Sequence, residues 1–394
     1  MKIGVDTFEC EHGKSNAGSY LNNILKNIAK CKIDVPIDIE LFGAESDRND
    51  FEDFVSEVSS EKSSSSSNIN ISFVAVELPE SPTRVRLWHS VGCNSFFQKR
   101  KYDVVVFLGI SFLPIKCRLP SLLITNDILS NRISALPFYS RIKVAISLRN
   151  FSKIIVPTQF VKKDLKALRI HADRIAVVHN GLDHSVFYPR ASDSDFVDIK
   201  PFAIQKPYFI YVSRISSPSK RHCELIKAFS EFKDKTKLPH RLVLAGEEGD
   251  YFGQVQKAAF DSPYASDIFL TGYYPHESYP ELYAGAEACI YPSICEGGGM
   301  PVIEAMSMGI PVVCAKNGGI PEVAGENAIY FDGNSVSDMA AAMEKVSMTD
   351  EASVNARTKM VENALQWAGR FSWQKVSDDI LSEIQSILSK KKKK

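Results

Sequence analysis

Short apolar runs bounded by turn residues alternate with helical patterns along the chain. They predict two series of strands. The first comprises Lys2–Val5, Ile37–Phe42, Ile69–Val76, Asp103–Leu108, Ser121–Thr125 and Lys153–Pro157. The second comprises Tyr208–Val212, Arg241–Ala245, Asp267–Leu270, Ala288–Tyr291, Pro311–Cys314 and Ala328–Phe331. Continuous apolar strands separated by helices are typical of parallel sheets covered on both faces, so we expect an α/β protein with two doubly wound domains.

The boundary between these domains is predicted between Tyr188 and Pro207, where prolines and aspartates interrupt any regular pattern. We therefore expect an N-terminal domain over residues 1–195 and a second domain over residues 205–371. Within the first domain, the serine run Ser63–Ser67 is typical of a solvated loop.

Composition and charge narrow the class of protein. With 394 residues, 44% hydrophobic and 24% charged, the chain is an ordinary globular protein. The 47 basic and 47 acidic residues cancel, but five lysines lie at Lys390–Lys394, which leaves residues 1–389 with a net charge of −5. A body of that sign argues against nucleic acid as a partner. The lysine tail suits contact with anionic lipid headgroups, or it only keeps the protein in solution.

Eight cysteines are scattered singly, a usage that indicates small core residues in a reducing compartment. The first residues lack the pattern of a signal peptide, and the longest apolar run, Val104–Ile115, is too short to span a bilayer. We expect a cytoplasmic protein, at most peripheral to the inner face of a membrane.

The stretch from Tyr291 to Glu322 is the most informative for chemistry. A strand there ends in the glycine-rich turn Gly297–Gly299, and a helix follows with Pro301 at its first position and Gly309 at its end. The amides of Gly298, Gly299 and Met300 would then point out of a helix N-terminus, where a phosphate is favoured.

Two carboxylates flank this anion site. Glu296 precedes the predicted helix and Glu304 lies one turn inside it. A carboxylate beside a phosphate is useful when it accepts hydrogen bonds from hydroxyls, so the pattern favours a cradle for a nucleotide sugar. The alternative is an ordinary strand–turn–helix unit with two surface glutamates.

Arg214 and Lys220 lie six residues apart after the strand Tyr208–Val212. Two cations at one strand–helix turn can reach a single diphosphate and neutralise its charge as it leaves. Taken alone, both residues also fit solvated surface positions.

Together, Arg214, Lys220 and the segment from Glu296 to Glu304 resemble the retaining, family-4 glycosyltransferases of the GT-B fold. Their motif is a strand-borne arginine, a lysine just downstream and a glutamate pair eight positions apart. The resemblance implies two Rossmann-like domains facing across a cleft. It also implies that a closing helix over residues 372–394 crosses back to the N-terminal domain.

The resemblance further implies roles for individual residues. Arg214 and Lys220 would bind the donor diphosphate, Glu296 would hold hydroxyls of the transferred sugar, and Glu304 would take the ribose hydroxyls. The remaining donor-binding positions would be Gly18, Gly272, Tyr273, Gly297, Gly298, Gly299, Met300 and Pro301. The acceptor would bind the N-terminal domain, and the reaction would proceed with retention, without a metal or another cofactor.

Two positions depart from the family pattern. Many relatives carry a histidine–aspartate pair where this chain has Asn126 and Asp127, and asparagine can donate a hydrogen bond but cannot carry a proton. Relatives also usually have an aromatic residue in place of Gly298. We still assign Asn126 and Asp127 to the catalytic group.

Several questions stay open at this point. GDP-mannose is the favoured donor, because the stretches around Lys220 and Asn180 resemble bacterial mannosyltransferases of surface-polysaccharide assembly, but UDP-glucose and UDP-N-acetylglucosamine remain alternatives. The acceptor would be a saccharide or a lipid-linked saccharide. A UDP-sugar epimerase of the same fold and a non-catalytic nucleotide-sugar binder are the rival functions. Asp193 and Asp195 spell a metal-binding pair but lie in the predicted linker, so no metal site is expected.

Overall fold

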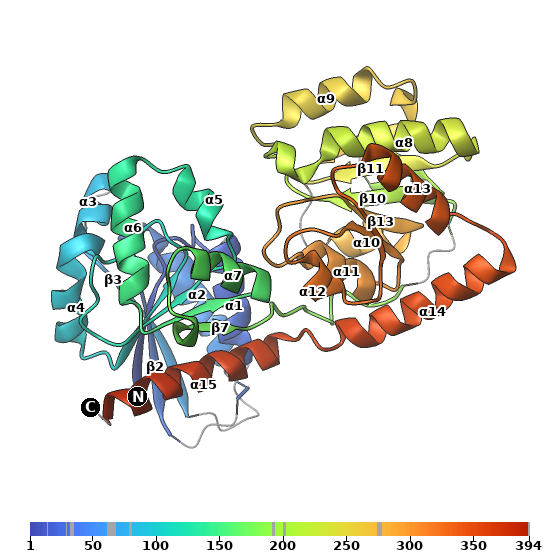
Figure 1. Ribbon diagram of the computed structural model, residues 1–394. Helices are drawn as coiled ribbons and strands as arrows, with labels where there is room; N and C mark the ends of the chain where they lie inside the picture. The colour runs from blue at the N-terminus through green and yellow to red at the C-terminus, as the bar shows by residue number, and fades with distance from the viewer. Residues whose placement is uncertain are drawn as a thin grey trace. The chain divides into compact units, whose positions relative to one another are not determined.

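The chain forms two compact units in a computed structural model that describes residues 1–13, 15–28, 30–31, 35–60, 68–78, 81–190, 194–199, 202–273 and 278–392 (Figure 1). The first unit comprises Met1–Gly181 and Trp373–Lys394, and the second comprises Leu182–Ser372. The division after Gly181 lies before the predicted boundary. The reason is that Leu182 and Phe187 are buried in the core of the second unit. The serine run Ser63–Ser67 lies outside the described residues.

The first unit is built on a seven-stranded sheet with the order β3-β2-β1-β4-β5-β6-β7, and every neighbouring pair is parallel. The strands are β1 Lys2–Asp6, β2 Ile37–Gly43, β3 Ile69–Ala75, β4 Val104–Leu108, β5 Ser121–Ile124, β6 Lys153–Val156 and β7 Ile175–Val177. Strand β7 is short and was not predicted from the sequence.

Helices cover both faces of this sheet, which explains why its strands are apolar throughout. In β4, Val104, Val106 and Leu108 face one core while Val105 and Phe107 face the other, as the two-residue repeat of a strand requires. The helices are α1 Asn16–Ile28, α2 Arg48–Ser60, α3 Pro82–Leu87, α4 Cys93–Arg100, α5 Leu129–Ser134, α6 Phe138–Asn150, α7 Gln159–Ala167 and α15 Trp373–Lys392. A five-residue π-helix, Trp88–Gly92, joins α3 to α4.

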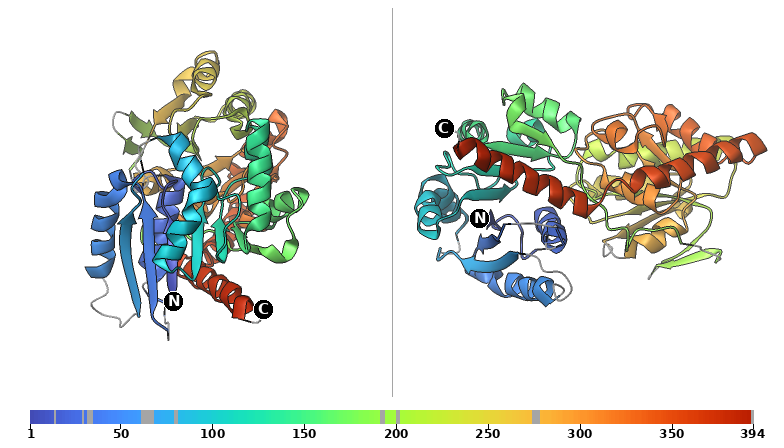
Figure 2. Two further views of the ribbon diagram at one scale, coloured as in Figure 1. Left: turned by 90° about the vertical axis from the view of Figure 1, so that its left-hand side faces the viewer. Right: turned by 90° about the horizontal axis from the view of Figure 1, so that it is seen from below.

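Helix α15 (red in Figures 1 and 2) belongs to the first unit although it ends the chain. It packs against α1: the rings of Tyr20 and Trp373 lie 5.1 Å apart, and the Ser377 hydroxyl donates to the Ile24 carbonyl at 3.2 Å. Val376, Ile380 and other residues at helical spacing join the core there. The first unit is therefore assembled from both ends of the chain.

The second unit carries a six-stranded parallel sheet with the order β12-β11-β10-β13-β14-β15. Its strands are β10 Tyr208–Val212, β11 Arg241–Ala245, β12 Ile268–Gly272, β13 Ala288–Tyr291, β14 Val312–Ala315 and β15 Ile329–Phe331. Its helices are α8 His222–Thr236, α9 Phe252–Phe260, α10 Tyr279–Ala284, α11 Met300–Ser307, α12 Ile320–Ala324, α13 Val336–Val346 and α14 Glu351–Ala368. A separate antiparallel pair, β8 Phe196–Ile199 and β9 Phe202–Gln205, lies in the predicted linker.

Both sheets follow the strand order of a doubly wound Rossmann-like domain, so the predicted α/β fold class is confirmed. Within the described ranges, no helix is long and apolar enough to cross a membrane. No disulfide joins any of the eight cysteines, all of which are described, and five of them are buried, as small core residues would be.

Candidate active site

The second unit has its topological switch point between β10 and β13. From β10 the chain continues to β11 and β12 on one side, and β13 leads to β14 and β15 on the other. The loops that follow β10 and β13 therefore run in opposite directions, and in open α/β sheets ligands bind where such loops diverge. The sequence-predicted Arg214 and Lys220 follow β10, and Glu296 follows β13.

Lys220 and Glu296 meet across this switch point. The Lys220 ammonium contacts the Glu296 carboxylate, and the two side chains are only 22% and 13% exposed. The loops that carry them are joined by a hydrogen bond in which the Ile294 amide donates to the Ser219 carbonyl at 3.0 Å. The Tyr211 hydroxyl also donates to the Lys220 carbonyl at 2.9 Å. Two residues 76 positions apart in the sequence are thus brought together by their own ion pair and by one backbone hydrogen bond between their loops.

The loop after β14 fixes the backbone of Glu296. The Gly319 amide donates to the Glu296 carbonyl at 2.8 Å. Gly318 adopts a φ of +63°, and a Cβ there would come within 2.8 Å of the Glu296 carbonyl oxygen. Glycine is required at position 318 for both reasons. Gly318 and Gly319 received no role from the sequence, although their pairing after a strand was a usable signal.

Helix α11 begins beside Glu296 without a side-chain cap. Its N-cap, Gly299, has φ 54° and ψ 41° and, as a glycine, brings no side chain that could accept from the first amides of the helix. The helix starts at Met300, so Pro301 is its second residue and not its first as predicted. A helix start left open in this way suits an anionic group.

Glu304 is buried in the second unit and is only 5% exposed. The hydroxyl of Tyr283, itself fully buried, lies 3.3 Å from Glu304 Oε2 and donates to it. Burial and the nearby Glu304 charge hold the pKa of Tyr283 well above its usual value, so the phenol remains a donor. Glu304 is therefore an interior carboxylate rather than a surface glutamate.

Other predicted donor residues lie nearer the solvent. Arg214 Nε lies 3.1 Å from Glu247 Oε2, in an exposed pair at the ends of β10 and β11. Gly272 ends β12 with a φ of +72°, and Tyr273 is 70% exposed. Among the described residues, no hydrogen bond or ion pair joins Arg214, Gly272 or Tyr273 to Lys220 or Glu296, and residues 274–277 lie outside the described part.

His222 is a residue of this region that the sequence did not single out. It opens α8 two positions after Lys220, is 1% exposed, and its ring lies 4.7 Å from that of Tyr211. Burial and the adjacent Lys220 charge lower its pKa to about 4. The imidazole is therefore neutral near pH 7 and adds no second cation beside Lys220.

In the first unit, Asn126 and Asp127 follow β5. Asn126 is exposed, and the Asp127 carboxylate is paired with Arg132 of α5. Gly18 lies in α1, where a Cβ would come within 2.6 Å of the Cys10 carbonyl and of Gly13. Its small size is thus used to pack the loop after β1 against α1.

Glu9 organises the switch point of the first unit, between β1 and β4. Its carboxylate accepts from the amide of Ser111, from the Ser111 hydroxyl at 3.0 Å and from the Phe112 amide at 3.2 Å. Burial raises the pKa of Glu9, against the opposing effect of these hydrogen bonds. The sequence did not identify this residue, because its partners lie 102 positions away.

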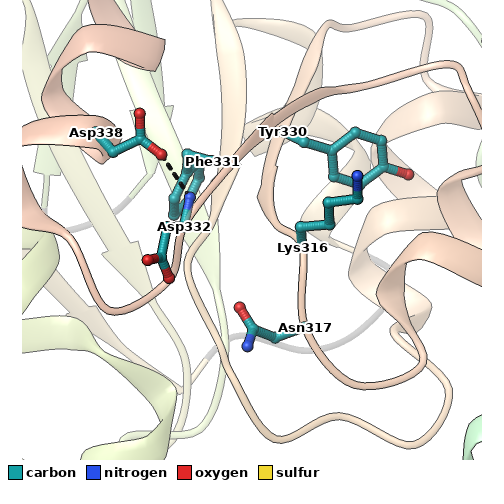
Figure 3. A pocket seen from close by; sticks show the side chains of 6 residues that line it. All are labelled: Lys316, Asn317, Tyr330, Phe331, Asp332 and Asp338. Carbon is teal, nitrogen blue, oxygen red and sulfur yellow. Dashed lines mark hydrogen bonds between the residues drawn. The ribbon is translucent and has the colours of Figure 1, made fainter.

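A pocket of about 410 Å³ lies at the ends of β14 and β15, and not at the switch point between β10 and β13. It is lined by Lys316, Asn317, Tyr330, Phe331, Asp332 and Asp338 (Figure 3). Asp338 accepts from the Asp332 amide at 2.6 Å, so this carboxylate also shapes the loop. None of the donor-site residues predicted from the sequence lines this pocket.

Among the residues that the structure describes, no three histidine, cysteine, aspartate or glutamate side chains are grouped as metal ligands. Asp193, part of the pair weighed above as a metal motif, lies outside these residues.

Two family models match the chain, one for each part of it. Residues 37–186 match Glycosyltransferase Family 4, and residues 194–367 match Glycosyl transferases group 1. The two matches together extend over most of the first unit and nearly all of the second.

Among curated proteins, the chain is 27% identical over 233 residues to O-antigen chain mannosyltransferase B of Escherichia coli, covering 58% of this chain and 59% of that protein. It is 32% identical over 171 residues to the serotype-specific mannosyltransferase WbdA of E. coli, covering 41% of this chain and 20% of that protein. Among solved structures, Anabaena Alr3699/HepE in complex with UDP and glucose superposes with a TM-score of 0.70 at 19% identity. That match covers 98% of this chain and all of the other.

Proposed function

The chain belongs to the family-4, group 1 glycosyltransferases, and on that premise we propose that it transfers a hexose from a nucleoside-diphosphate sugar to a saccharide or lipid-linked saccharide. The observation that carries this proposal is the contact of Lys220 with Glu296 at the switch point of the second unit. One group there suits phosphate and the other suits sugar hydroxyls, at the place where such folds bind ligands. We further propose retention of anomeric configuration and a role in surface-polysaccharide synthesis.

In this proposal the donor diphosphate binds Lys220, Arg214 and the amides of Gly298, Gly299 and Met300. Support comes from the start of α11, which directly follows the loop that carries Glu296 and whose N-cap Gly299 brings no capping side chain. Arg214 is exposed and paired with Glu247, so it must turn from that carboxylate to reach the phosphate. The positive charges stabilise the diphosphate as it leaves, which is the task that a metal performs elsewhere.

Glu296 then accepts hydroxyls of the transferred sugar. Before the donor binds, Lys220 and Glu296 neutralise each other in a half-enclosed site, where a lone charge would be costly. When a diphosphate takes the ammonium, the carboxylate becomes available for hydroxyl donors. The substrate thus replaces both partners of the ion pair. Its diphosphate takes the place of Glu296 beside Lys220, and its hydroxyls take the place of Lys220 beside Glu296.

Glu304 is proposed to take the ribose hydroxyls, and Gly272 with Tyr273 to line the base pocket. Gly297 and Pro301 complete the donor loop on either side of the α11 start. Mannose is the proposed hexose, because the E. coli relatives are named as mannosyltransferases. The Anabaena protein was solved with UDP, so uridine and guanosine donors both need to be tested.

For the reaction, we propose displacement on one face of the sugar. The bond between the anomeric carbon and the diphosphate oxygen breaks, and the acceptor oxygen bonds to the same carbon. The acceptor proton passes to the leaving phosphate, so no enzyme base is needed. Asn126 and Asp127 belong to the first unit, to which we assign binding of the acceptor. Gly18 also belongs to the first unit, and we propose that it contributes to binding of the donor.

A cytoplasmic location with peripheral membrane contact is also proposed. Eight cysteines without a disulfide among them support a reducing compartment. The lysines at the end of α15 offer a contact with anionic lipid.

The function is tested with a panel of GDP-, UDP- and ADP-sugars. For each sugar nucleotide, two quantities are measured without acceptor: the shift of the protein's thermal midpoint and the rate of nucleotide release. We expect one donor to stabilise the protein and to be hydrolysed slowly, and both effects to disappear in Glu296→Gln and Lys220→Ala. The matched controls are Glu344→Gln and Lys235→Ala, which break the Lys235–Glu344 ion pair between α8 and α13.

The outcomes separate the rival functions. If a donor stabilised the protein but no nucleotide were released, even after acceptors had been screened, the protein would be a non-catalytic binder. Interconversion of a UDP-sugar into its epimer would indicate the epimerase. No response to any sugar nucleotide would refute the donor site.

A further inference from the structure

Helix α6 of the first unit carries an exposed apolar stripe beside the exposed Arg141 and Arg149. Its inward positions, Val144 and Leu148, are buried as expected. Its outward positions Tyr139, Ile142 and Ile146 are 85%, 45% and 41% exposed and follow the three- and four-residue spacing of one helical stripe. A surface helix normally carries polar residues on its outer face, and one that is apolar all round is normally buried.

The exposed stripe continues onto the neighbouring α3 and π-helix. Leu87 and Val91 are 63% and 64% exposed, and Phe138 at the start of α6 is 70% exposed. Lys143 of α6 donates to the hydroxyl of Ser90, which lies between Leu87 and Val91. These segments are therefore in contact. We call this surface the α6 patch, defined by Leu87, Val91, Phe138, Tyr139, Ile142 and Ile146.

The α6 patch lies in a strongly basic segment of the chain. Residues 81–150 contain 11 lysines and arginines against two aspartates, although the whole chain is neutral. The two aspartates are Asp103, whose carboxylate accepts from the Lys2 amide, and Asp127, which pairs with Arg132. Within the described ranges, no carboxylate forms an ion pair with the exposed Arg84, Arg86, Lys116 or Arg118. The apolar side chains of the patch thus share their helices with cations, Arg84 and Arg86 on α3 and Arg141 and Arg149 on α6.

We propose that the α6 patch docks the protein on a bilayer that contains anionic lipids. Aromatic and aliphatic side chains would enter the interface, and the flanking cations would lie at the level of the phosphate headgroups. A second copy of the chain is a poor occupant, because two-fold pairing through this face would bring two strongly positive surfaces together. The placement suits an acceptor carried on a lipid, but binding to lipid does not depend on the proposed activity.

Vesicle binding by the full chain tests the proposal. The probes are vesicles of equal parts phosphatidylglycerol and phosphatidylcholine, and vesicles of phosphatidylcholine alone. We expect binding to the anionic vesicles that weakens as salt is raised from about 0.1 to 0.5 M, because the charges become screened. Ile142→Ser combined with Ile146→Ser should weaken the partitioning about tenfold, because apolar burial supplies much of the affinity. These side chains are 45% and 41% exposed, so the thermal midpoint should fall by only a few degrees and the variant should stay folded at the temperature of the assay.

Two controls separate the patch from other sources of binding. Phe260→Ser removes an exposed aromatic side chain of the second unit, 82% exposed, and should leave vesicle binding unchanged. Replacing Lys390–Lys394 with serines tests the lysine tail and should reduce binding only in part. The proposal is overturned if the chain ignores anionic vesicles, if the double variant binds as well as the native chain, or if the tail variant alone abolishes binding. A native dimer that the patch variants dissociate would also overturn it.

Discussion

Gly318→Ala tests whether the position of Glu296 controls donor turnover. Alanine at position 318 is unfavourable in the folded protein for two reasons. The backbone has a φ of +63°, which costs an L-residue about 1–2 kcal/mol relative to glycine. The new Cβ would also lie 2.8 Å from the Glu296 carbonyl oxygen, whereas ordinary contact begins at 3.4 Å. The loop that carries Glu296 must therefore retreat by about 0.6 Å, and misplacement by 1 Å can cost about 100-fold in rate.

Gly309→Ala is the matched control. Gly309 has a φ of +74°, so it bears the same backbone cost, but its Cβ would meet Pro189 at 3.6 Å, an ordinary contact. It lies at the opposite end of α11 from Glu296. Both variants should lose about 2–8 °C of thermal midpoint. Only Gly318→Ala should also slow nucleotide release from the donor, by about tenfold.

The assay is nucleotide release at saturating donor, alongside thermal melts of both variants. If Gly318→Ala turned over the donor as fast as Gly309→Ala, the position of the Glu296 backbone would not matter, and the role assigned to this carboxylate would be wrong. If both variants lost turnover equally, the effect would be one of general destabilisation.

Two further predictions concern buried ionisable groups. Glu304→Ala should weaken binding of the nucleoside diphosphate alone by about tenfold, because charge-assisted hydrogen bonds to the ribose are lost; calorimetry with GDP and UDP measures this, and an unchanged affinity would contradict the ribose role. His222 should make the fold sensitive to acid. Its pKa is about 4 when folded against an ordinary 6.5, so the unfolded chain binds the extra proton first. Stability should therefore fall as the pH drops from about 6.5 to 4, by up to about 3 kcal/mol. Urea unfolding across that range measures the slope, and His222→Asn should flatten it. An equal slope in the variant would assign the acid sensitivity to other groups.

Much of the fold could be predicted because the strands are buried on both faces. In β4, five consecutive apolar residues serve two cores, so the segment appears in the sequence as an uninterrupted hydrophobic run. The same holds for β10, whose five residues are all buried. The short β7 and the β8–β9 pair escaped prediction because three or four residues carry too little periodicity to identify a strand.

By itself the sequence determined the types of group available for chemistry. The cations of Arg214 and Lys220, the glycines before α11 and the carboxylates of Glu296 and Glu304 all lie in local patterns, because turns and helix starts are decided by neighbouring residues. Tertiary structure decided which of them meet. Lys220 contacts Glu296 because β10 and β13 are adjacent in the sheet, whereas Arg214 turns to Glu247 on the other side.

Tertiary structure alone also decided charge and exposure. The neutral state of His222 and the interior place of Glu304 follow from burial, which no local pattern encodes. The α6 patch is the opposite case, because there apolar side chains are left exposed. Its residues carry no motif in the sequence, and only the packing of α6 shows that an apolar stripe is left uncovered beside exposed arginines. Contacts between distant segments, and the water that they exclude, are properties of the packed chain and not of any one segment.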